Sequence, residues 1–123
     1  MKTFVLTIAI SILSWSAFAT TGGATTLKEV KNLGKGLSKV TWYYENGAVA
    51  EEGFYLNGKK HGTWTSYNEK GQKTVMANWL SDKKEGRSYI MHENGQVKYQ
   101  ITYSDNKKIS ANEYDENGLT ITK

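Results

Sequence analysis

The sequence predicts an all-β protein built from repeated hairpins, and three observations support this fold class. First, a short polar run ending in glycine recurs at steps of 24, 24 and 23 residues, at Gly47, Gly71, Gly95 and Gly118. Second, apolar and polar residues alternate between these turns, and third, the 123-residue chain contains no proline. A fixed period of roughly 20 to 50 residues is typical of repeat architectures. We therefore expect an antiparallel meander of β-hairpins that forms a single extended, twisted sheet.

The first 19 residues have the features of a secretory signal peptide. Lys2 provides a positive start, residues 4–13 are mostly apolar, and Ala17-Phe18-Ala19 has the small-x-small pattern that precedes a cleavage site. The alternative is a membrane anchor, which needs about 20 apolar residues, whereas serines interrupt this stretch. Cleavage after Ala19 would export the protein to the periplasm or out of the cell.

Residues 20–37 precede the repeats and are expected to contain a flexible leader followed by a short capping helix. Thr26-Leu27-Lys28-Glu29 fits a capping box, and Leu27, Val30 and Leu33 would share one helical face. Gly34 and Gly36 would end this helix. Terminal repeats need caps, so the helix would cover the open end or face of the sheet. The alternative for this segment is one more irregular strand.

Residues 38–123 form the predicted repeat domain. Val75, Ala77 and Trp79 alternate with polar residues, and this period of two is typical of half-buried strands. The expected strands are residues 39–44, 49–56, 62–67, 73–80, 86–92, 97–103, 109–114 and 119–123.

Two families of turns are expected to join these strands. Asn46-Gly47 suits a type I′ hairpin turn, as do Asn94-Gly95 and Asn117-Gly118, because both central residues of that turn need positive φ. Asn57-Gly58 marks the turn at the other end of the first unit. Ser81-Asp82 and Asp105-Asn106 replace it in the following units and hold turns through Asx geometry.

Two sets of side chains recur with the repeat and form the candidate binding surface. Tyr55, Trp79 and Tyr103 are 24 residues apart and are expected to line up as an aromatic ladder. Trp64, Ser88 and Asn112 would form a second column. The candidate surface consists of Trp42, Tyr55, Trp79, Tyr103, Lys59, Lys60, Lys83 and Lys84.

Each part of this surface has two interpretations. The lysine pairs would line one rim of the sheet, either as solvated turn residues that discourage aggregation or as an electrostatic landing strip for an anionic partner. The aromatic residues would either be buried by their neighbours or bind an envelope glycan by stacking.

The sequence contains no constellation typical of an active site. His61 and His92 occupy non-equivalent repeat positions, and cysteine is absent, so no metal site is expected. Glu51 and Glu52 are adjacent on a strand and point to opposite faces, so they cannot act together on one glycosidic bond. Acidic residues interleave with the lysines, which argues against nucleic acid as a partner. We therefore expect a protein without enzymatic activity, cofactor or metal.

The motifs of the first unit resemble a known repeat. Tyr43-Tyr44-Glu45-Asn46-Gly47, followed by Asn57-Gly58-Lys59-Lys60-His61-Gly62-Thr63-Trp64 and by Tyr67, is similar to the MORN repeat variant of bacterial proteins. The resemblance covers residues 42–123 and is strongest in this unit. Ser88 replaces the tryptophan of the second unit, and Ser110 replaces the glycine of the third.

The resemblance implies a binding or scaffolding role. Many bacterial members carry the label of antitoxin, and eukaryotic relatives are associated with membrane lipids and protein assembly. We expect an exported, non-catalytic protein-interaction or scaffold module. The alternatives are a surface that binds envelope glycan or a lipid membrane, and a periplasmic immunity protein that resembles an antitoxin. The last predicted strand would leave an open edge for strand addition or edge-to-edge oligomers.

Overall fold

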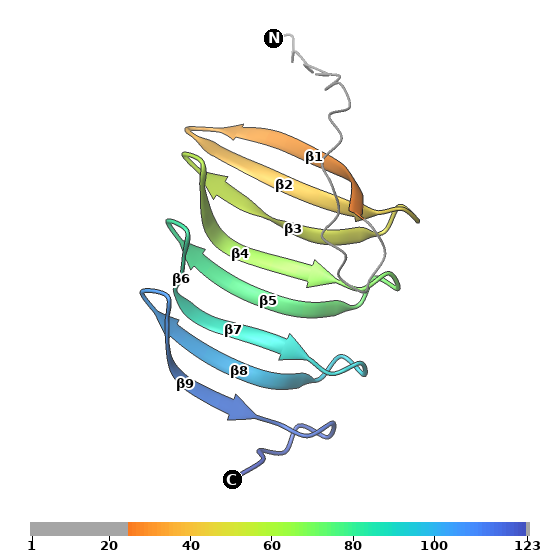
Figure 1. The fold of residues 1–123 in the computed structure, drawn as a ribbon, viewed down its shortest axis with the longest axis vertical. Helices are drawn as coiled ribbons and strands as arrows, with labels where there is room; N and C mark the ends of the chain where they lie inside the picture. Colours follow the sequence, from red (N-terminus) through yellow and green to blue (C-terminus); the bar gives the residue numbers. More distant parts are fainter. Residues whose placement is uncertain (1–24, 123) are drawn as a thin grey trace.

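A computed structural model describes residues 25–122 and shows one antiparallel β-sheet, with no helix in this range (Figure 1). The predicted signal peptide and the start of the leader lie outside the described residues. The strands are β1 (Thr25–Gly34), β2 (Leu37–Tyr44), β3 (Val49–Leu56), β4 (Lys59–Tyr67), β5 (Lys73–Leu80), β6 (Lys83–Lys84), β7 (Gly86–Met91), β8 (Val97–Ser104) and β9 (Lys107–Glu113).

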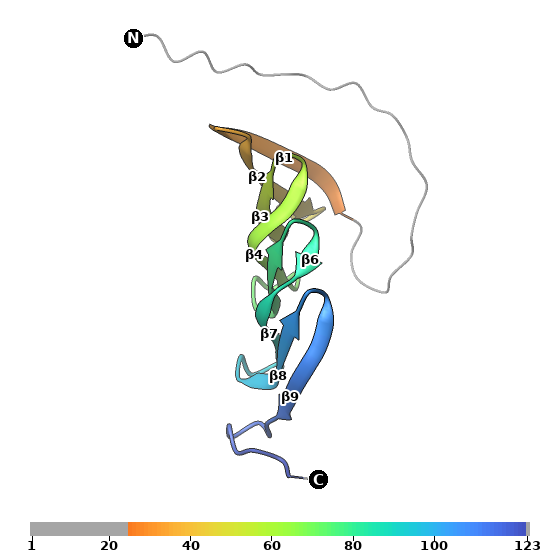
Figure 2. The same ribbon diagram turned by 90° about the vertical axis from the view of Figure 1, so that its left-hand side faces the viewer.

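The strands follow one another across the sheet in chain order, with β6 pairing only with β5. Every pairing between the described strands is antiparallel and joins strands that are close in sequence. Seen from its side, the sheet is a single layer (Figure 2). The prediction of an extended meander of hairpins is therefore confirmed.

The predicted capping helix is wrong, because its residues form strand β1. This strand pairs with β2 from Thr25 to Gly34, and a turn with positive φ at Lys35 and Gly36 joins the two strands. A short isolated helix is marginal in water, whereas the open edge of β2 offers a full row of hydrogen bonds. The apolar side chains assigned to the helical face stay exposed on β1: Leu27 by 63%, Val30 by 57% and Leu33 by 46%.

The structure contains type I′ turns, but they lie at the end of the hairpins opposite to the predicted Asn-Gly turns. At Asn57-Gly58, Ser81-Asp82 and Asp105-Asn106, both turn residues have positive φ, as a two-residue type I′ turn requires. At Asn46-Gly47 only Gly47 has positive φ. There the Gly47 N–H donates to the Tyr44 carbonyl at 2.9 Å and the Tyr44 N–H to the Ala48 carbonyl at 2.8 Å.

This second pattern is a three-residue loop in which a type I turn is followed by a left-handed glycine. The loops that end at Gly71, Gly95 and Gly118 repeat the first of these hydrogen bonds. The prediction of type I′ turns at Asn46-Gly47, Asn94-Gly95 and Asn117-Gly118 is therefore wrong. The asparagine instead caps its own loop, since Asn46 Oδ1 accepts a hydrogen bond from the Ala48 N–H at 2.9 Å.

The third unit is one residue shorter than the others, and this changes its register. Ala111 pairs with Ile101, as Ser88 does on the other side of Ile101. Ala111 therefore continues the column of Trp64 and Ser88, and the predicted place of Asn112 in that column is wrong. The predicted last strand at residues 119–123 is also absent from the described residues, where only a bridge joins Tyr114 to Thr120.

Within residues 25–122 neither side of the sheet carries a second layer, and few side chains are deeply buried. The buried hydrophobic residues of the described chain are Val40, Ala50, Trp64 and Ala77. Trp64 is 4% exposed and lies against Gly53, where an added Cβ would collide with the indole ring. Its indole N–H donates to the Phe54 carbonyl at 3.0 Å. Val40, Trp64 and Ala77 thus form a buried strip along one face of the sheet.

Candidate functional site: an aromatic–lysine ladder

The strand register divides the sheet into two unlike faces, since residues paired across neighbouring strands point to the same side. One of them, here called the aromatic face, carries Val40, Trp42, Tyr55, Lys60, Trp64, Val75, Ala77, Trp79, Lys84, Ser88, Ile101 and Tyr103. The opposite face carries polar residues such as Lys39, Thr41, Glu52, Thr65 and Gln100, together with Phe54, Met76 and Tyr89. The predicted aromatic column and all of its rings lie on the first face.

The aromatic column alternates with lysines instead of stacking ring on ring. Tyr55 pairs with Lys60 and Trp79 with Lys84 across adjacent strands. The Lys60 ammonium lies 4.3 Å from the ring centroid of Trp64 and 4.6 Å from that of Trp79. The Lys84 ammonium lies 5.7 Å from Trp79 and 4.9 Å from Tyr103. Distances within about 6 Å are typical of cation–π contacts, so the two lysines bridge consecutive repeats.

Tyr55, Lys60, Trp64, Trp79, Lys84 and Tyr103 together form the aromatic–lysine ladder. At its first rung the Tyr55 and Trp64 rings meet edge to face, with centroids 5.1 Å apart and planes at 81°. The ladder lysines and the rings of Tyr55, Trp79 and Tyr103 are all half-buried. They are therefore packed by neighbours and still accessible from solvent.

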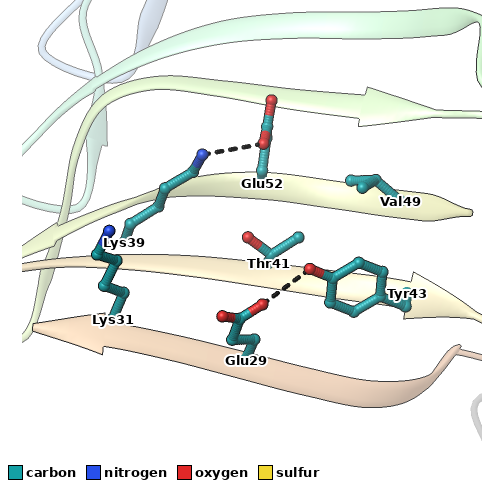
Figure 3. A pocket seen from close by; sticks show the side chains of 7 residues that line it. All are labelled: Glu29, Lys31, Lys39, Thr41, Tyr43, Val49 and Glu52. Carbon is teal, nitrogen blue, oxygen red and sulfur yellow. Dashed lines mark hydrogen bonds and ion pairs between the residues drawn. The ribbon is translucent and has the colours of Figure 1, made fainter. Parts of the chain in front are cut away.

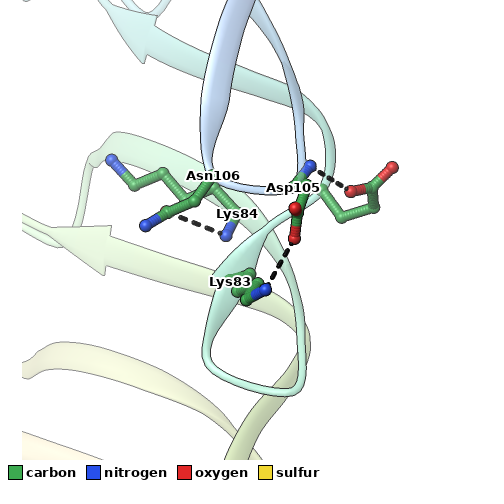
Figure 4. Close-up of polar contacts among 5 residues, drawn as sticks. Lys83, Lys84, Asp105 and Asn106 are labelled. Atoms are coloured by element: carbon green, nitrogen blue, oxygen red, sulfur yellow. Dashed lines mark hydrogen bonds and ion pairs between the residues drawn. The ribbon is translucent and has the colours of Figure 1, made fainter.

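The backbone of each ladder lysine is held by the turn of the next repeat. The Asp82 N–H donates to the Lys60 carbonyl at 3.1 Å, and the Lys60 N–H donates to Asp82 Oδ1 at 2.7 Å. Asn106 makes the same pair of contacts with Lys84, at 2.9 Å and 3.3 Å (Figure 4). Both Asx residues have positive φ, which Asn and Asp tolerate better than most residues. The turns thus fix the backbone of the ladder lysines.

The other two candidate lysines point to the opposite side, because successive residues of a strand alternate between faces. Lys59 and Lys83 are exposed and lie beside the turns. Lys83 donates to Asp105 Oδ1 at 2.8 Å, and this hydrogen bond raises the pKa of Lys83 (Figure 4). The predicted rim of lysine pairs is therefore split between the two faces. Only Lys60 and Lys84 join the aromatic residues.

Trp42 lies on the aromatic face but outside the ladder. It pairs with Lys28 on one side and Glu51 on the other, and the Lys28 ammonium lies 4.8 Å from its ring centroid. A cation over a ring thus recurs at the β1 end of the face, away from the ladder column.

The opposite face contains a shallow pocket of about 240 Å³ near β1 (Figure 3). Its lining residues are Glu29, Lys31, Lys39, Thr41, Tyr43, Val49 and Glu52. Lys39 Nζ is 3.3 Å from Glu52 Oε2. The Tyr43 hydroxyl donates to Glu29 Oε2 at 2.9 Å, and this contact raises the pKa of Tyr43. Glu29, Lys39 and Glu52 thus each have a partner within the pocket.

The sequence reasoning missed this pocket because it assigned residues 26–33 to a helix. Glu29 and Lys31 are two residues apart and point to the same side only in a strand. The sequence contains no alternation that reveals this strand, because the apolar residues Leu27, Val30 and Leu33 are three positions apart.

The two histidines have separate structural surroundings. His92 Nε2 lies 2.8 Å from the Tyr114 carbonyl, where Tyr44 in the first unit donates its hydroxyl to the Tyr67 carbonyl at 2.6 Å. His92 therefore links successive loops, while His61 pairs with Phe54 on the opposite face. Across residues 25–122, no three His, Cys, Asp or Glu side chains are grouped so as to hold a metal ion. The same range contains no helix suited to crossing a bilayer.

The fold and the ladder define a single-layer β-repeat protein with a broad, partly exposed aromatic surface. The family described as MORN repeat variant matches residues 38–57, 60–80 and 84–105, which together are half of the chain. The chain therefore belongs to the MORN repeat variant family. Each match contains two strands joined by a three-residue loop. Searches among curated proteins and among solved structures gave no match.

Proposed function

We propose that this chain is an exported, non-catalytic protein-interaction module that binds its partner through the aromatic face. The observation that carries this proposal is the set of half-buried rings and lysines on a face that no other part of residues 25–122 covers. Aromatic side chains that remain accessible in a broad patch mark interaction surfaces. Membership of a family of repeat-based binding modules supports the same function.

Site-specific photo-crosslinking in the native cell tests which face binds. A benzophenone amino acid replaces Tyr103 on the aromatic face in one variant and Thr102 on the opposite face in the matched control. Both positions belong to β8 and are half-buried. We expect a discrete adduct with one protein from position 103 and none from position 102. Equal labelling from both positions, or adducts from position 102 alone, would contradict the proposal.

Export is the second part of the proposal and rests on the signal-peptide features of residues 1–19. The mature protein would begin at Thr20 and occupy the periplasm or the extracellular space. Cell fractionation followed by intact-mass measurement tests this. A cytosolic protein that keeps residues 1–19 would refute it.

A further inference from the structure

The outer edge of strand β1 has no partner among residues 25–122. β1 lies at one end of the sheet and pairs only with β2 (Figure 1). Such an edge presents a row of free N–H and C=O groups, which is a template for pairing with another strand. At the other end of the sheet, the edge of β9 is partly occupied, since the Ile121 N–H donates to the Glu113 carbonyl at 2.8 Å. β1 is therefore the more open of the two edges.

The pairing of β2 shows which residues of β1 direct their backbone groups outward. The Asn57 N–H donates to the Gly36 carbonyl at 2.8 Å, so the backbone of Gly36 faces β3. Because backbone groups alternate between the two edges along a strand, the even-numbered residues of β2 face β3 and the odd-numbered ones face β1. These odd-numbered residues pair with the odd-numbered residues of 27–31. The residues of β1 that face the open edge are therefore Lys28, Val30 and Asn32.

β1 also carries a positive charge that the fold does not neutralise. Lys31 lies directly opposite Lys39, whose ammonium group forms an ion pair with Glu52 at 3.3 Å. Lys31 itself has no carboxylate partner among the described residues, and like charges opposite each other destabilise a sheet. Glu29 lies two residues before Lys31 on the same face (Figure 3). One of its oxygens accepts from the Tyr43 hydroxyl at 2.9 Å, and the other is available to a further donor.

The strand is complementary to a second copy of itself in a register centred on Val30. When two copies run antiparallel with Val30 opposite Val30, Lys31 of each copy lies opposite Glu29 of the other. A centre at Lys28, Glu29 or Lys31 would instead place two like charges opposite each other. The register centred on Val30 also pairs the open backbone groups, because Val30 then faces Val30 and Lys28 faces Asn32.

We propose that this chain forms a two-fold symmetric dimer in which the β1 strands of two copies pair antiparallel around Val30. The two Val30 residues exchange backbone hydrogen bonds at the axis, and two ion pairs between Glu29 and Lys31 flank them. The dimer also covers apolar side chains that are 63%, 57% and 46% exposed in the single chain, namely Leu27, Val30 and Leu33. Because the interface is isologous, the assembly closes at two copies.

The dimer places both aromatic faces on the same side. Its two-fold axis is perpendicular to the sheet, because residues paired across antiparallel strands point to one face. Val30 pairs with Val40 and thus lies on the aromatic face of each copy. A partner with repeated sites would therefore meet two aromatic–lysine ladders on one continuous surface and bind with greater avidity. This inference goes beyond the proposed function and does not depend on it.

Charge variants of β1 test the register in solution. Sedimentation equilibrium of the purified chain over a concentration series should show monomers and dimers. Glu29→Lys or Lys31→Glu alone places like charges opposite each other at two sites, and each should raise the dissociation constant about tenfold or more. An equal mixture of these two variants should associate within about threefold of the wild-type dissociation constant, because one copy then carries lysine at both positions and the other glutamate.

Lys108→Glu on β9 is the matched control, because it makes the same change of charge on the strand at the other end of the sheet. It should alter the dissociation constant by about twofold or less. A wild-type chain that stays monomeric throughout, or an equal loss of association in Lys108→Glu and Lys31→Glu, would overturn the inference. Assemblies that grow beyond two copies would indicate pairing of β1 with β9 and would also overturn it.

Single cysteines test the same register by an independent measurement, which also decides the matter if a charge variant does not fold. The chain contains no cysteine, so one introduced at Val30 has only its own copy to join. Opposite residues of a hydrogen-bonded pair have Cα atoms about 5.5 Å apart, which a disulfide spans. The control is Asn32→Cys, because the two Asn32 positions are offset by four residues, or about 14 Å. Mild oxidation should give a covalent dimer of Val30→Cys and leave Asn32→Cys monomeric. Equal crosslinking of both variants, or none of Val30→Cys, would refute the proposed pairing.

Discussion

Gly53→Ala is the substitution whose effect follows most directly from the packing of the aromatic face. Gly53 is buried and, among the glycines described, it alone has no positive φ. Its lack of a side chain is therefore needed for space and not for backbone conformation. A Cβ at this position would overlap the indole of Trp64 more closely than real Cβ contacts allow. Either the ring or the strand must move.

The cost of this change follows from what holds the ring in place. Trp64 is 4% exposed, donates to the Phe54 carbonyl at 3.0 Å and packs edge to face on Tyr55 at 5.1 Å. Overpacking costs about 1–3 kcal/mol, and complete removal of a buried tryptophan costs about 3–5 kcal/mol. We expect Gly53→Ala to lower the free energy of unfolding by about 2–4 kcal/mol, between these limits.

The second repeat suggests the compensating change. Ala77 is the residue 24 positions after Gly53, and Ser88 is the residue 24 positions after Trp64. We expect Gly53→Ala with Trp64→Ser to be about as stable as Trp64→Ser alone, because the smaller side chain leaves room for the methyl group. The coupling energy would then be about 2–4 kcal/mol, in the range of residues in direct contact.

Urea unfolding of the wild type, both single variants and the double variant measures this coupling. Gly71→Ala is the control, because Gly71 has a φ of 81° and nothing lies within 4 Å of an added Cβ. Its cost of about 1–2 kcal/mol is backbone strain alone, and it should add to that of Trp64→Ser. If Gly53→Ala also adds to Trp64→Ser, the steric argument is refuted.

Three further predictions concern the ladder, the turns and the opposite face. Trp79→Ala should destabilise the fold by about 2–4 kcal/mol in thermal unfolding, because truncating a half-buried tryptophan costs less than truncating a fully buried one. An unchanged midpoint would show that the ladder is not structural. Asp82→Ala should lower the free energy of unfolding, measured in urea, by about 1–3 kcal/mol because the Lys60 N–H loses its acceptor. Asp82→Asn should be about as stable as the wild type, because Asn106 makes the equivalent contact in the next repeat. Equal losses of stability in the two variants would contradict this reasoning. Burial and the hydrogen bond to Glu52 raise the pKa of Tyr67 above 10.0. The protonated Tyr67 hydroxyl therefore stabilises the fold below pH 10, and this stabilisation is lost as the pH rises through the raised pKa. Spectrophotometric titration should show a lower Tyr67 pKa in Glu52→Gln, and an unchanged value would exclude the role of Glu52.

Much of the fold was accessible from the sequence because its signals are local and repeated. The alternation at Val75, Ala77 and Trp79 predicted strand β5, and the recurrent glycines located the loops. Errors occurred where one local pattern fits two structures. Thr26 to Leu33 satisfies a helical capping box and also an edge strand, and Asn-Gly satisfies a type I′ turn and also the end of a three-residue loop.

The sequence by itself determined the repeat, the class of fold and the membership of the aromatic column, since period and alternation depend on neighbours along the chain. Only the tertiary structure decided that Lys60 and Lys84 enter that column while Lys59 and Lys83 leave it. It also decided that Ala111, and not Asn112, continues the column of Trp64. The physical reason is the register between strands, because bulges and turn lengths set which side chains meet across a sheet.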